Sequence, residues 1–187
     1  MIMKKQLLLL VITLFVSAGA MAQTEHLKFM GIPLNGIITQ FQNKIMAKGL
    51  QVNSAANKFI PAGCRAFTGV FSGKNADIYV YYDEKTKLVY KAKAVITFYQ
   101  DSYRQSAFEK FKESLDNKYS GMASTDEQDG YPSYILIVEN SKEERIGDIS
   151  MYMTDRENSY PAEYTLHIDY NDELNSEKHE KNNDDDL

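Results

Sequence analysis

The sequence predicts an α+β fold in which two helix-plus-three-strand repeats form one antiparallel sheet with both helices on one face. Apolar and polar residues alternate through residues 77–99, as in a half-buried strand pair. Residues 29–50 and 101–121 instead carry apolar residues at helical spacing. Three further strand-like segments follow the second helix, so the order of one helix and three strands occurs twice. The alternative arrangement is two separate sheets.

The first repeat covers about residues 29–99 and begins with the amphipathic helix of residues 29–50. Its apolar side contains Leu34, Ile37, Ile38, Phe41 and Ile45. Gly49 followed by Leu50 is typical of a left-handed C-cap with an apolar contact. Residues 51–64 are expected to be irregular, with Phe59 and Ile60 in the core, before a strand from Arg65 to Phe71.

The alternating segment from Asp77 to Tyr99 is expected to be a β-hairpin whose even-numbered residues are buried. One register would bring apolar pairs together on the buried face and place Tyr and Asp opposite Lys on the other face. That register pairs Tyr82 with Leu88, Val80 with Tyr90, Ile78 with Ala92, Tyr81 with Val89, Tyr79 with Lys91, and Asp77 with Lys93. A hairpin of this length needs further strands and a covering layer, which the rest of the chain must supply.

The second repeat covers about residues 101–170 and begins with a helix that Ser102 and Gln105 would start as a capping box. The apolar stripe of this helix contains Tyr103, Ala107, Phe108, Phe111, Leu115 and Tyr119. The polar segment from Met122 to Tyr131 is expected to be a loop. Three strands follow, at Ser133 to Glu139, Arg145 to Thr154 and Ala162 to Tyr170.

The two ends of the chain differ in composition from the single domain predicted for residues 23–170. Residues 1–22 have two lysines, an apolar run and the small residues Ala20 and Ala22, which predict a cleaved signal peptide. We therefore expect an exported protein, periplasmic or extracellular, with no stable membrane insertion after cleavage. Residues 171–187 are acidic and nearly free of large apolar side chains, so a disordered tail is expected.

Short motifs in the first repeat give a resemblance to known proteins. The F-x-G-I-P opening of Phe29 to Pro33 and the strand from Phe67 to Phe71 resemble small uncharacterised exported proteins of Bacteroidetes-type bacteria. The duplicated order of elements is similar to the tandem-repeat β-lactamase inhibitory protein, and this resemblance implies a sheet that binds a partner protein. Neither resemblance implies a catalytic residue.

The sequence predicts no metal site, cofactor site or nucleic-acid interface. His26, His167 and His179 lie in separate segments without ligand spacing. The acidic loop that begins at Asp126 has Ile137 where a calcium loop needs its bidentate glutamate. The chain has no glycine-rich nucleotide motif, and its 21 Lys and Arg residues against 26 Asp and Glu residues leave no basic excess to neutralise phosphates.

The sequence also predicts that the protein is not an enzyme. His167 and Asp169 share one face of a strand, but no nucleophile motif accompanies them, so a structural role is favoured over a hydrolase. Cys64 is the single cysteine and is expected to be a small buried residue. The converging titratable groups that a catalytic site needs are not evident.

The thirteen tyrosines are the most unusual feature of the composition. Four of them, Tyr82, Tyr90, Tyr164 and Tyr170, share parity with core residues. Others have the opposite parity and would form an aromatic, polar outer face of the kind that recognition surfaces use. The candidate binding residues on that face are Tyr79, Tyr81, Lys91, Tyr99, Tyr152 and His167. Alternatively, residues 51–64 cover this face, or its tyrosines serve strand propensity alone.

The functional hypothesis is an exported, non-enzymatic binding module that holds a protein or a glycan on its outer sheet face. The alternative is a structural or self-associating envelope protein, which differs from the first hypothesis only in its partner. The oligomeric state and the ligand do not follow from the sequence.

Overall fold

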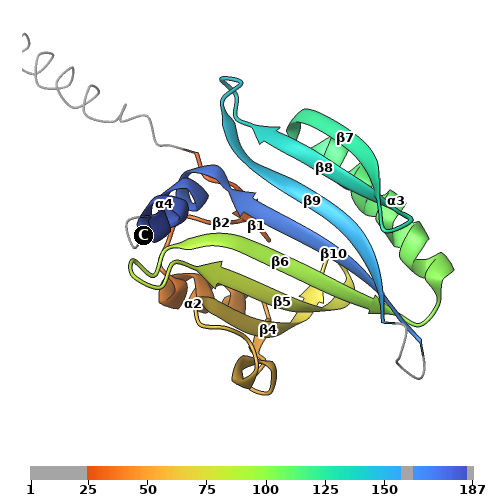
Figure 1. Ribbon diagram of the computed structural model, residues 1–187, viewed down its shortest axis with the longest axis horizontal. Helices are drawn as coiled ribbons and strands as arrows, with labels where there is room; N and C mark the ends of the chain where they lie inside the picture. Colours follow the sequence, from red (N-terminus) through yellow and green to blue (C-terminus); the bar gives the residue numbers. More distant parts are fainter. Residues whose placement is uncertain (1–24, 157–161, 185–187) are drawn as a thin grey trace, which may run out of the picture.

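The computed structural model describes residues 25–156 and 162–184 (Figure 1). The predicted signal peptide, residues 1–22, lies outside the described residues. The described chain forms one antiparallel sheet of eight strands in the order β3-β4-β5-β6-β10-β9-β8-β7. These strands are β3 (Gln51–Val52), β4 (Cys64–Phe71), β5 (Lys74–Tyr82), β6 (Val89–Phe98), β7 (Ser120–Gln128), β8 (Tyr131–Glu139), β9 (Arg145–Arg156) and β10 (Glu163–Asp172).

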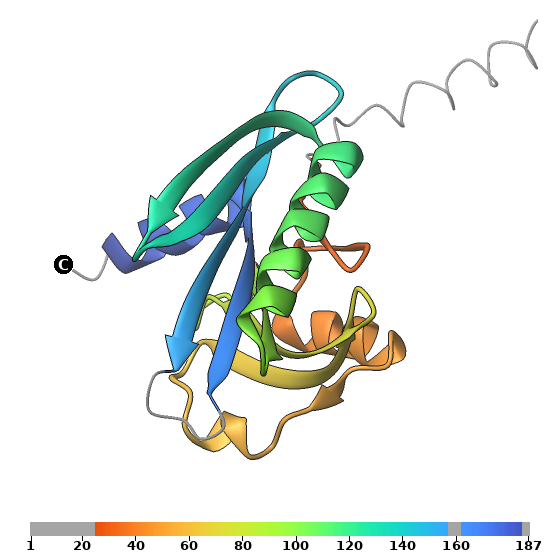
Figure 2. The ribbon, with the colours of Figure 1, turned by 90° about the vertical axis from the view of Figure 1, so that its right-hand side faces the viewer.

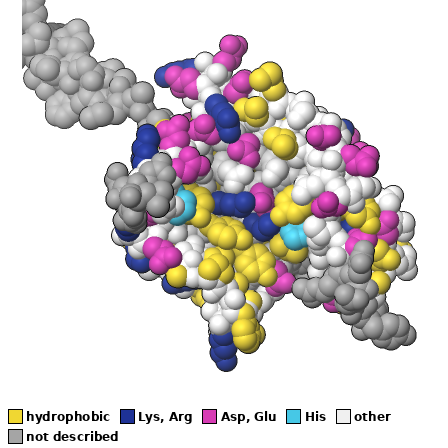
Figure 3. Space-filling view, in the orientation of Figure 1, with side chains coloured by type: hydrophobic (Ala, Val, Ile, Leu, Met, Phe, Trp, Pro, Cys, Tyr) yellow, Lys and Arg dark blue, Asp and Glu magenta, His cyan; other side chains and the backbone are white. Residues whose placement is uncertain are grey.

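Helices cover both faces of this sheet. The helices α2 (Ile38–Ala47) and α3 (Asp101–Lys118) lie on one face, together with the short hairpin of β1 (Lys28–Phe29) and β2 (Ile32–Pro33) (Figure 2). The helix α4 (Glu173–Asp184) lies on the opposite face, across one end of the central strands (Figures 1 and 2). We call the face under α2 and α3 the inner face, and the face toward the viewer in Figures 1 and 3 the outer face.

The predicted fold class is therefore wrong. The structure is mainly β, with four strands rather than three after each of α2 and α3, and its third α-helix lies on the other face of the sheet. The extra strand of the first half is β3, only two residues long, and it pairs with Thr68 and Phe67 of β4. In the second half the extra strand is β7, which occupies the segment expected to be a loop. Every residue of β7 is exposed, so it carries no alternation of buried and exposed positions.

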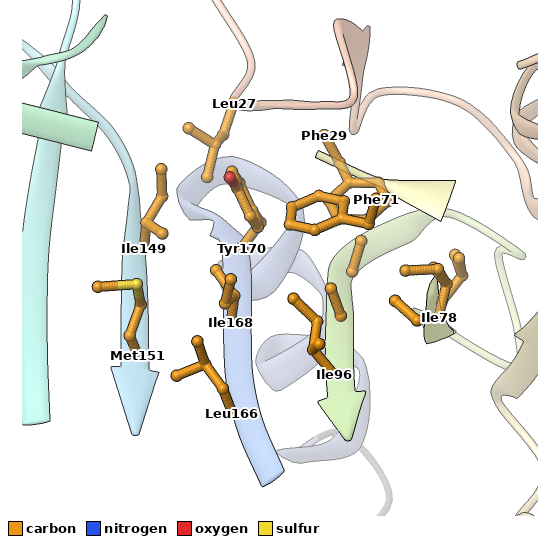
Figure 4. Close-up of a cluster of buried hydrophobic side chains, with 14 of the residues drawn as sticks. Leu27, Phe29, Phe71, Ile78, Ile96, Ile149, Met151, Leu166, Ile168 and Tyr170 are labelled. Carbon is orange, nitrogen blue, oxygen red and sulfur yellow. The ribbon is translucent and has the colours of Figure 1, made fainter. Parts of the chain in front are cut away.

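The hydrophobic core fills the space between the inner face and the helices. Figure 4 shows apolar side chains of β9, β10 and β6 beneath Leu27 and Phe29 of the N-terminal segment. The Phe29 ring stacks on Phe71 with centroids 5.4 Å apart and meets Tyr170 edge-on at 5.3 Å. Both Leu27 and Phe29 are fully buried, so this segment closes the core that the sheet and helices leave open.

The hairpin of β5 and β6 buries the predicted face in a different register. Ile78 and Val80 are fully buried, but they pair with Ala94 and Ala92, two residues beyond the predicted partners. The reason lies in the connection, where the Asp83 carboxylate accepts hydrogen bonds from the Lys85 and Thr86 backbone amides. Leu88 then forms a bridge with Ile37 instead of pairing with Tyr82.

A register shift between Tyr81 and Tyr82 follows from this connection and changes which residue enters the core. Val89 is fully buried, whereas the Tyr90 ring stacks on His179 of α4 with centroids 4.2 Å apart. The prediction that Tyr90 shares the core face is wrong, because the pairing steps from Lys91 to Val89 across a bulge that leaves Tyr90 out of the register and off the core face. Tyr82 keeps the predicted parity: it is half-buried and packs against the edge of the core.

The first helix agrees with its predicted C-cap. Gly49 has φ +95°, and the Leu50 amide donates to the Ile45 carbonyl at 3.3 Å. Leu50 is buried, which completes the apolar contact of the cap. In α3 the expected capping box is not present, since Gln100 is the N-cap and Ser102 lies inside the helix.

Two further predictions are wrong, one for the segment between β3 and β4 and one for the acidic C-terminal segment. Phe59 is 87% exposed rather than in the core, and Ile60 is only half-buried. The acidic tail is not disordered over Glu173–Asp184, which form α4. Polar contacts hold this helix: the buried Asn175 side chain donates to the carbonyls of Leu34 at 2.8 Å and Val89 at 2.9 Å. Composition alone does not reveal such partners, because they come from distant parts of the chain.

Candidate functional site

The outer face has an aromatic and charged surface that α4 leaves open. Figure 3 shows hydrophobic side chains, a class that includes Tyr, gathered around Lys or Arg side chains and two histidines across its middle. The sheet pairing explains this mixture, because the outward residues of four strands meet there in cross-strand rows. One row runs from Tyr79 through Lys93 to Asp169, and the next contains Val95, His167 and Tyr152.

A hollow of about 370 Å³ lies on this face, and we call it the central hollow. Residues of β5, β6, β9 and β10 line it: Tyr79, Tyr81, Lys93, Val95, Thr154, Asp155, Thr165 and His167. Its size is within the range of small-ligand sites, about 300 to 1,000 Å³. All of its walls are side chains on paired strands, so the sheet register sets their relative positions.

A buried carboxylate organises the charges at this site. Asp169 is 5% exposed and lies between the ammonium groups of Lys91 at 2.7 Å and Lys93 at 3.6 Å. Lys93 also donates to the Tyr152 hydroxyl at 2.6 Å. Burial lowers the pKa of Lys93, but the Tyr152 hydroxyl and the Asp169 charge outweigh this effect, and its pKa is raised overall. Lys93 is therefore charged and held in place.

The second charged group of the central hollow is paired as well. Asp155 accepts a hydrogen bond from the Arg104 guanidinium at 2.6 Å, and its other oxygen accepts one from the Tyr131 hydroxyl. Arg104 is fully buried on α3 and also contacts Asp101 at 2.5 Å. Both charges that line the hollow are thus compensated by partners of opposite sign.

His167 provides the neutral polar part of the site. Its ring stacks on Tyr152 at 4.6 Å with an interplanar angle of 3°, and its Nε2 lies 2.9 Å from the Thr154 hydroxyl and 3.1 Å from the Thr165 hydroxyl. Burial is the main cause that lowers the pKa of His167 to about 4, the Lys93 charge adds to it, and Asp169 opposes it. The imidazole is neutral at pH 7, in a fixed orientation between hydroxyl groups.

The protonation states at the site disfavour acid–base and nucleophilic chemistry near neutral pH. Burial, the largest cause, raises the pKa of Tyr81 well above its usual range, and nearby Cys64 and Asp169 add to this effect. Burial likewise raises the pKa of the Cys64 thiol. A catalytic acid or base is most effective with a pKa near the working pH, and His167 at about 4 does not meet this condition.

The structure brings most of the predicted site residues together. Tyr79, Tyr81 and His167 line the central hollow, and Tyr152 packs on His167. Lys91 lies beside them with its ammonium 5.7 Å from the centre of the Tyr81 ring. Tyr99 does not belong to this group: it follows the end of β6, is 69% exposed and does not line the hollow.

Sequence reasoning missed six residues of the site: Lys93, Val95, Thr154, Asp155, Thr165 and Asp169. Five of them share the outward parity of the predicted residues, and this was the only signal available in the sequence. Asp155 has the opposite parity, so no such signal marked it. Within residues 25–156 and 162–184 there is no group of three His, Cys, Asp or Glu side chains that could hold a metal ion. In the same part of the chain no helix is long and apolar enough to cross a membrane.

Comparison with known proteins adds no relative to this description. No family model matches the chain, and no curated protein or solved structure matches it.

Proposed function

We propose that this chain is an exported, non-enzymatic binding protein that holds a glycan in the central hollow of its outer face. The observation that carries the proposal is the combination of Tyr79 and Tyr81 with the hydroxyls of Thr154 and Thr165 and the neutral ring of His167 in one hollow. A sugar ring has apolar faces and a rim of hydroxyls. Tyrosine rings match the faces, and fixed hydroxyl and imidazole groups match the rim.

The charges at the site favour an uncharged ligand. Lys93 shares the Asp169 carboxylate with Lys91, and Asp155 shares the Arg104 guanidinium with Asp101. The charges of these six groups balance, so together they leave no net charge for the ligand to satisfy. A polar ligand without charge has less water to lose on binding than an ion, and it exchanges water for the fixed polar groups of the wall. The ion pairs orient the wall, because Lys93 holds the hydroxyl of the tyrosine on which His167 stacks.

The proposal is tested by binding of the mature protein to an array of oligosaccharides of defined structure, followed by titration of retained sugars. Tyr79→Ala and Thr154→Val should each weaken the titrated affinity, the tyrosine change by about 30-fold or more, as expected for loss of a central aromatic anchor. Tyr103→Ala is the matched control, because Tyr103 is 63% exposed on α3, on the other side of the sheet. Its affinity should equal that of the wild type.

Two results would contradict the proposal. One is an array on which no oligosaccharide is retained. The other is a retained sugar whose affinity Tyr79→Ala and Thr154→Val leave unchanged while the variants keep the wild-type melting temperature. Retention of a protein on the outer face, lost in the same two variants, would instead support the protein-binding form of the hypothesis and exclude the glycan.

A further inference from the structure

A second and larger hollow lies at the free edge of β4, away from the central hollow. It has a volume of about 570 Å³, and we call it the edge hollow. Its lining comes from α2, from the segment between β3 and β4, and from the sheet edge: Gln42, Val52, Ser54, Asn57, Lys58, Ile60, Pro61, Ala62, Cys64, Arg65 and Tyr82. None of the residues proposed to bind the glycan belongs to it.

Asn57 attaches the segment between β3 and β4 to one point on β4, and this attachment shapes the edge hollow. The Asn57 side chain donates to the carbonyls of Asn53 and Ala66, each at 2.8 Å, and accepts from the Ala66 amide at 2.9 Å. The short helix η1 (Ala56–Lys58) is thereby fixed to β4 at Ala66. Beyond this point the chain from Ile60 to Ala62 lines the hollow rather than continuing β3 along the strand.

The charge of the edge hollow is unusual for this acidic protein. Its lining contains Lys58 and Arg65 and no Asp or Glu. The other two arginines whose side chains the structure describes bind carboxylates: Arg104 contacts Asp155, and Arg145 contacts Glu173. Arg65 instead contacts neutral groups in the described part of the chain, namely the Gln42 carboxamide oxygen at 2.5 Å and the face of the Tyr82 ring at 6.0 Å.

The backbone adds a donor on the same side. The backbone amide of Tyr82 donates to the Gly63 carbonyl. Hydrogen-bonding backbone groups alternate along an antiparallel strand, so the odd-numbered residues of β4 are the ones that bond to β5. The even-numbered residues of β4 direct their amides away from β5, toward the free edge of the sheet, as Ala66 does toward Asn57. Cys64 is one of these even-numbered residues, and β3 does not extend far enough to pair with it. Its N–H is therefore directed to the edge hollow, next to the residue that carries the guanidinium.

The remaining walls are apolar. Val52, Ile60, Pro61 and Ala62 contribute aliphatic surface, and Tyr82 contributes an aromatic ring. A ligand that suits these walls has an apolar body as well as a negative group.

We infer that the edge hollow binds a small organic acid, whose carboxylate contacts the Arg65 guanidinium and the Cys64 amide while its apolar body lies against Ile60 and Tyr82. Arginine presents a planar set of donors that matches a carboxylate, and a charged hydrogen bond of this kind is shorter and stronger than a neutral one. Gln42 occupies only part of the guanidinium, so donors remain for an anion. This inference does not rest on the proposed glycan function.

Titration of the mature protein with benzoate, followed by amide chemical shifts, tests the inference. Benzoate should shift the amides of Cys64 and Arg65 and those of η1, with saturation in the millimolar range. Arg65→Gln should weaken the fitted affinity by about tenfold, the value of a hydrogen bond to a charged group. Lys44→Gln removes the same charge from an exposed position on α2 and should leave the affinity unchanged.

Three comparisons decide the chemistry of the ligand. Benzamide, which has the same body without the charge, should bind at least about tenfold more weakly than benzoate. Equal binding of benzamide, or equal benzoate affinity in wild type and Arg65→Gln, would overturn the inference. Phenyl phosphate binding much more tightly than benzoate would overturn the carboxylate assignment. If Arg65→Gln does not fold, Lys58→Gln serves in its place, because Lys58 is exposed and its loss should still weaken benzoate binding several-fold.

The outcome is separable from that of the glycan proposal. Tyr79→Ala should leave the benzoate affinity unchanged, because Tyr79 does not line the edge hollow. Loss of benzoate binding in Tyr79→Ala would show that the acid binds the central hollow and would refute the edge site.

Discussion

Protonation of His167 should make the protein less stable in mild acid. The pKa of His167 is about 4 in the folded protein, below the ordinary value of 6.5 that an imidazole has in an unfolded chain. Between these two values the unfolded chain binds a proton that the folded protein does not bind, so unfolding becomes more favourable as the pH falls from about 6.5 to about 4. The full difference corresponds to about 3 kcal/mol, since each pH unit is worth about 1.4 kcal/mol.

The structure gives the cause of this effect. A proton on the ring would place a positive charge beside the Lys93 ammonium, in a half-buried position stacked on Tyr152. Asp169 offsets part of the repulsion, but Lys91 and Lys93 already share that carboxylate. Water that enters the central hollow screens the charges, so we expect a measured loss of about 2 to 3 kcal/mol.

Urea unfolding between pH 7 and pH 4.5 measures the effect in the wild type and in His167→Gln. The glutamine amide can keep a hydrogen bond to the threonine hydroxyls without titrating. His26 and His179 are present in both proteins, so the difference between the two pH profiles isolates His167. The unfolding free energy of the wild type should fall more steeply than that of the variant. Parallel profiles would refute the account of a neutral, confined imidazole.

Further predictions concern the core, the C-terminal helix and an edge glycine. Ile78→Ala should lower the free energy of unfolding, measured in urea, by about 2 to 5 kcal/mol. The cavity cannot close, because the cross-strand neighbours of Ile78 are Phe67 and the small Ala94. A loss no larger than that of Tyr99→Ala would contradict the burial of Ile78. Asn175→Ala should lower the free energy of unfolding by about 1 to 3 kcal/mol, because it leaves two buried carbonyls unpaired. The control Glu177→Ala, at an exposed position of α4, should leave it unchanged. Equal melting temperatures of the two variants would mean that α4 does not dock on the sheet. Gly121→Ala should speed amide exchange in β7, because a Cβ there would lie 1.8 Å from the Ile137 carbonyl oxygen; unchanged exchange would exclude this close approach.

The sequence alone predicted the features that depend on a short local pattern. Alternation in β5 identified Ile78 and Val80 as buried, and both are fully buried. Gly49 identified the end of α2, because the cap needs a residue in the left-handed conformation, which glycine adopts at low cost. The same parity placed Tyr79, Tyr81 and His167 on one face, where they line one hollow. These inferences need only the two-residue period of a strand or the geometry of one turn.

Only the tertiary structure decided features that depend on partners distant in the sequence. The register of β5 and β6 differs by two residues from the prediction because Leu88 pairs with Ile37, outside the hairpin. The helix α4 forms because Asn175 finds the carbonyls of Leu34 and Val89. The contacts of Lys93 with Asp169 and of Thr154 with Thr165 require the pairing of β10 with β6 and β9. Parity gives the face of a residue, but its neighbours across the sheet depend on strand order and register, which backbone pairing and long-range packing determine together.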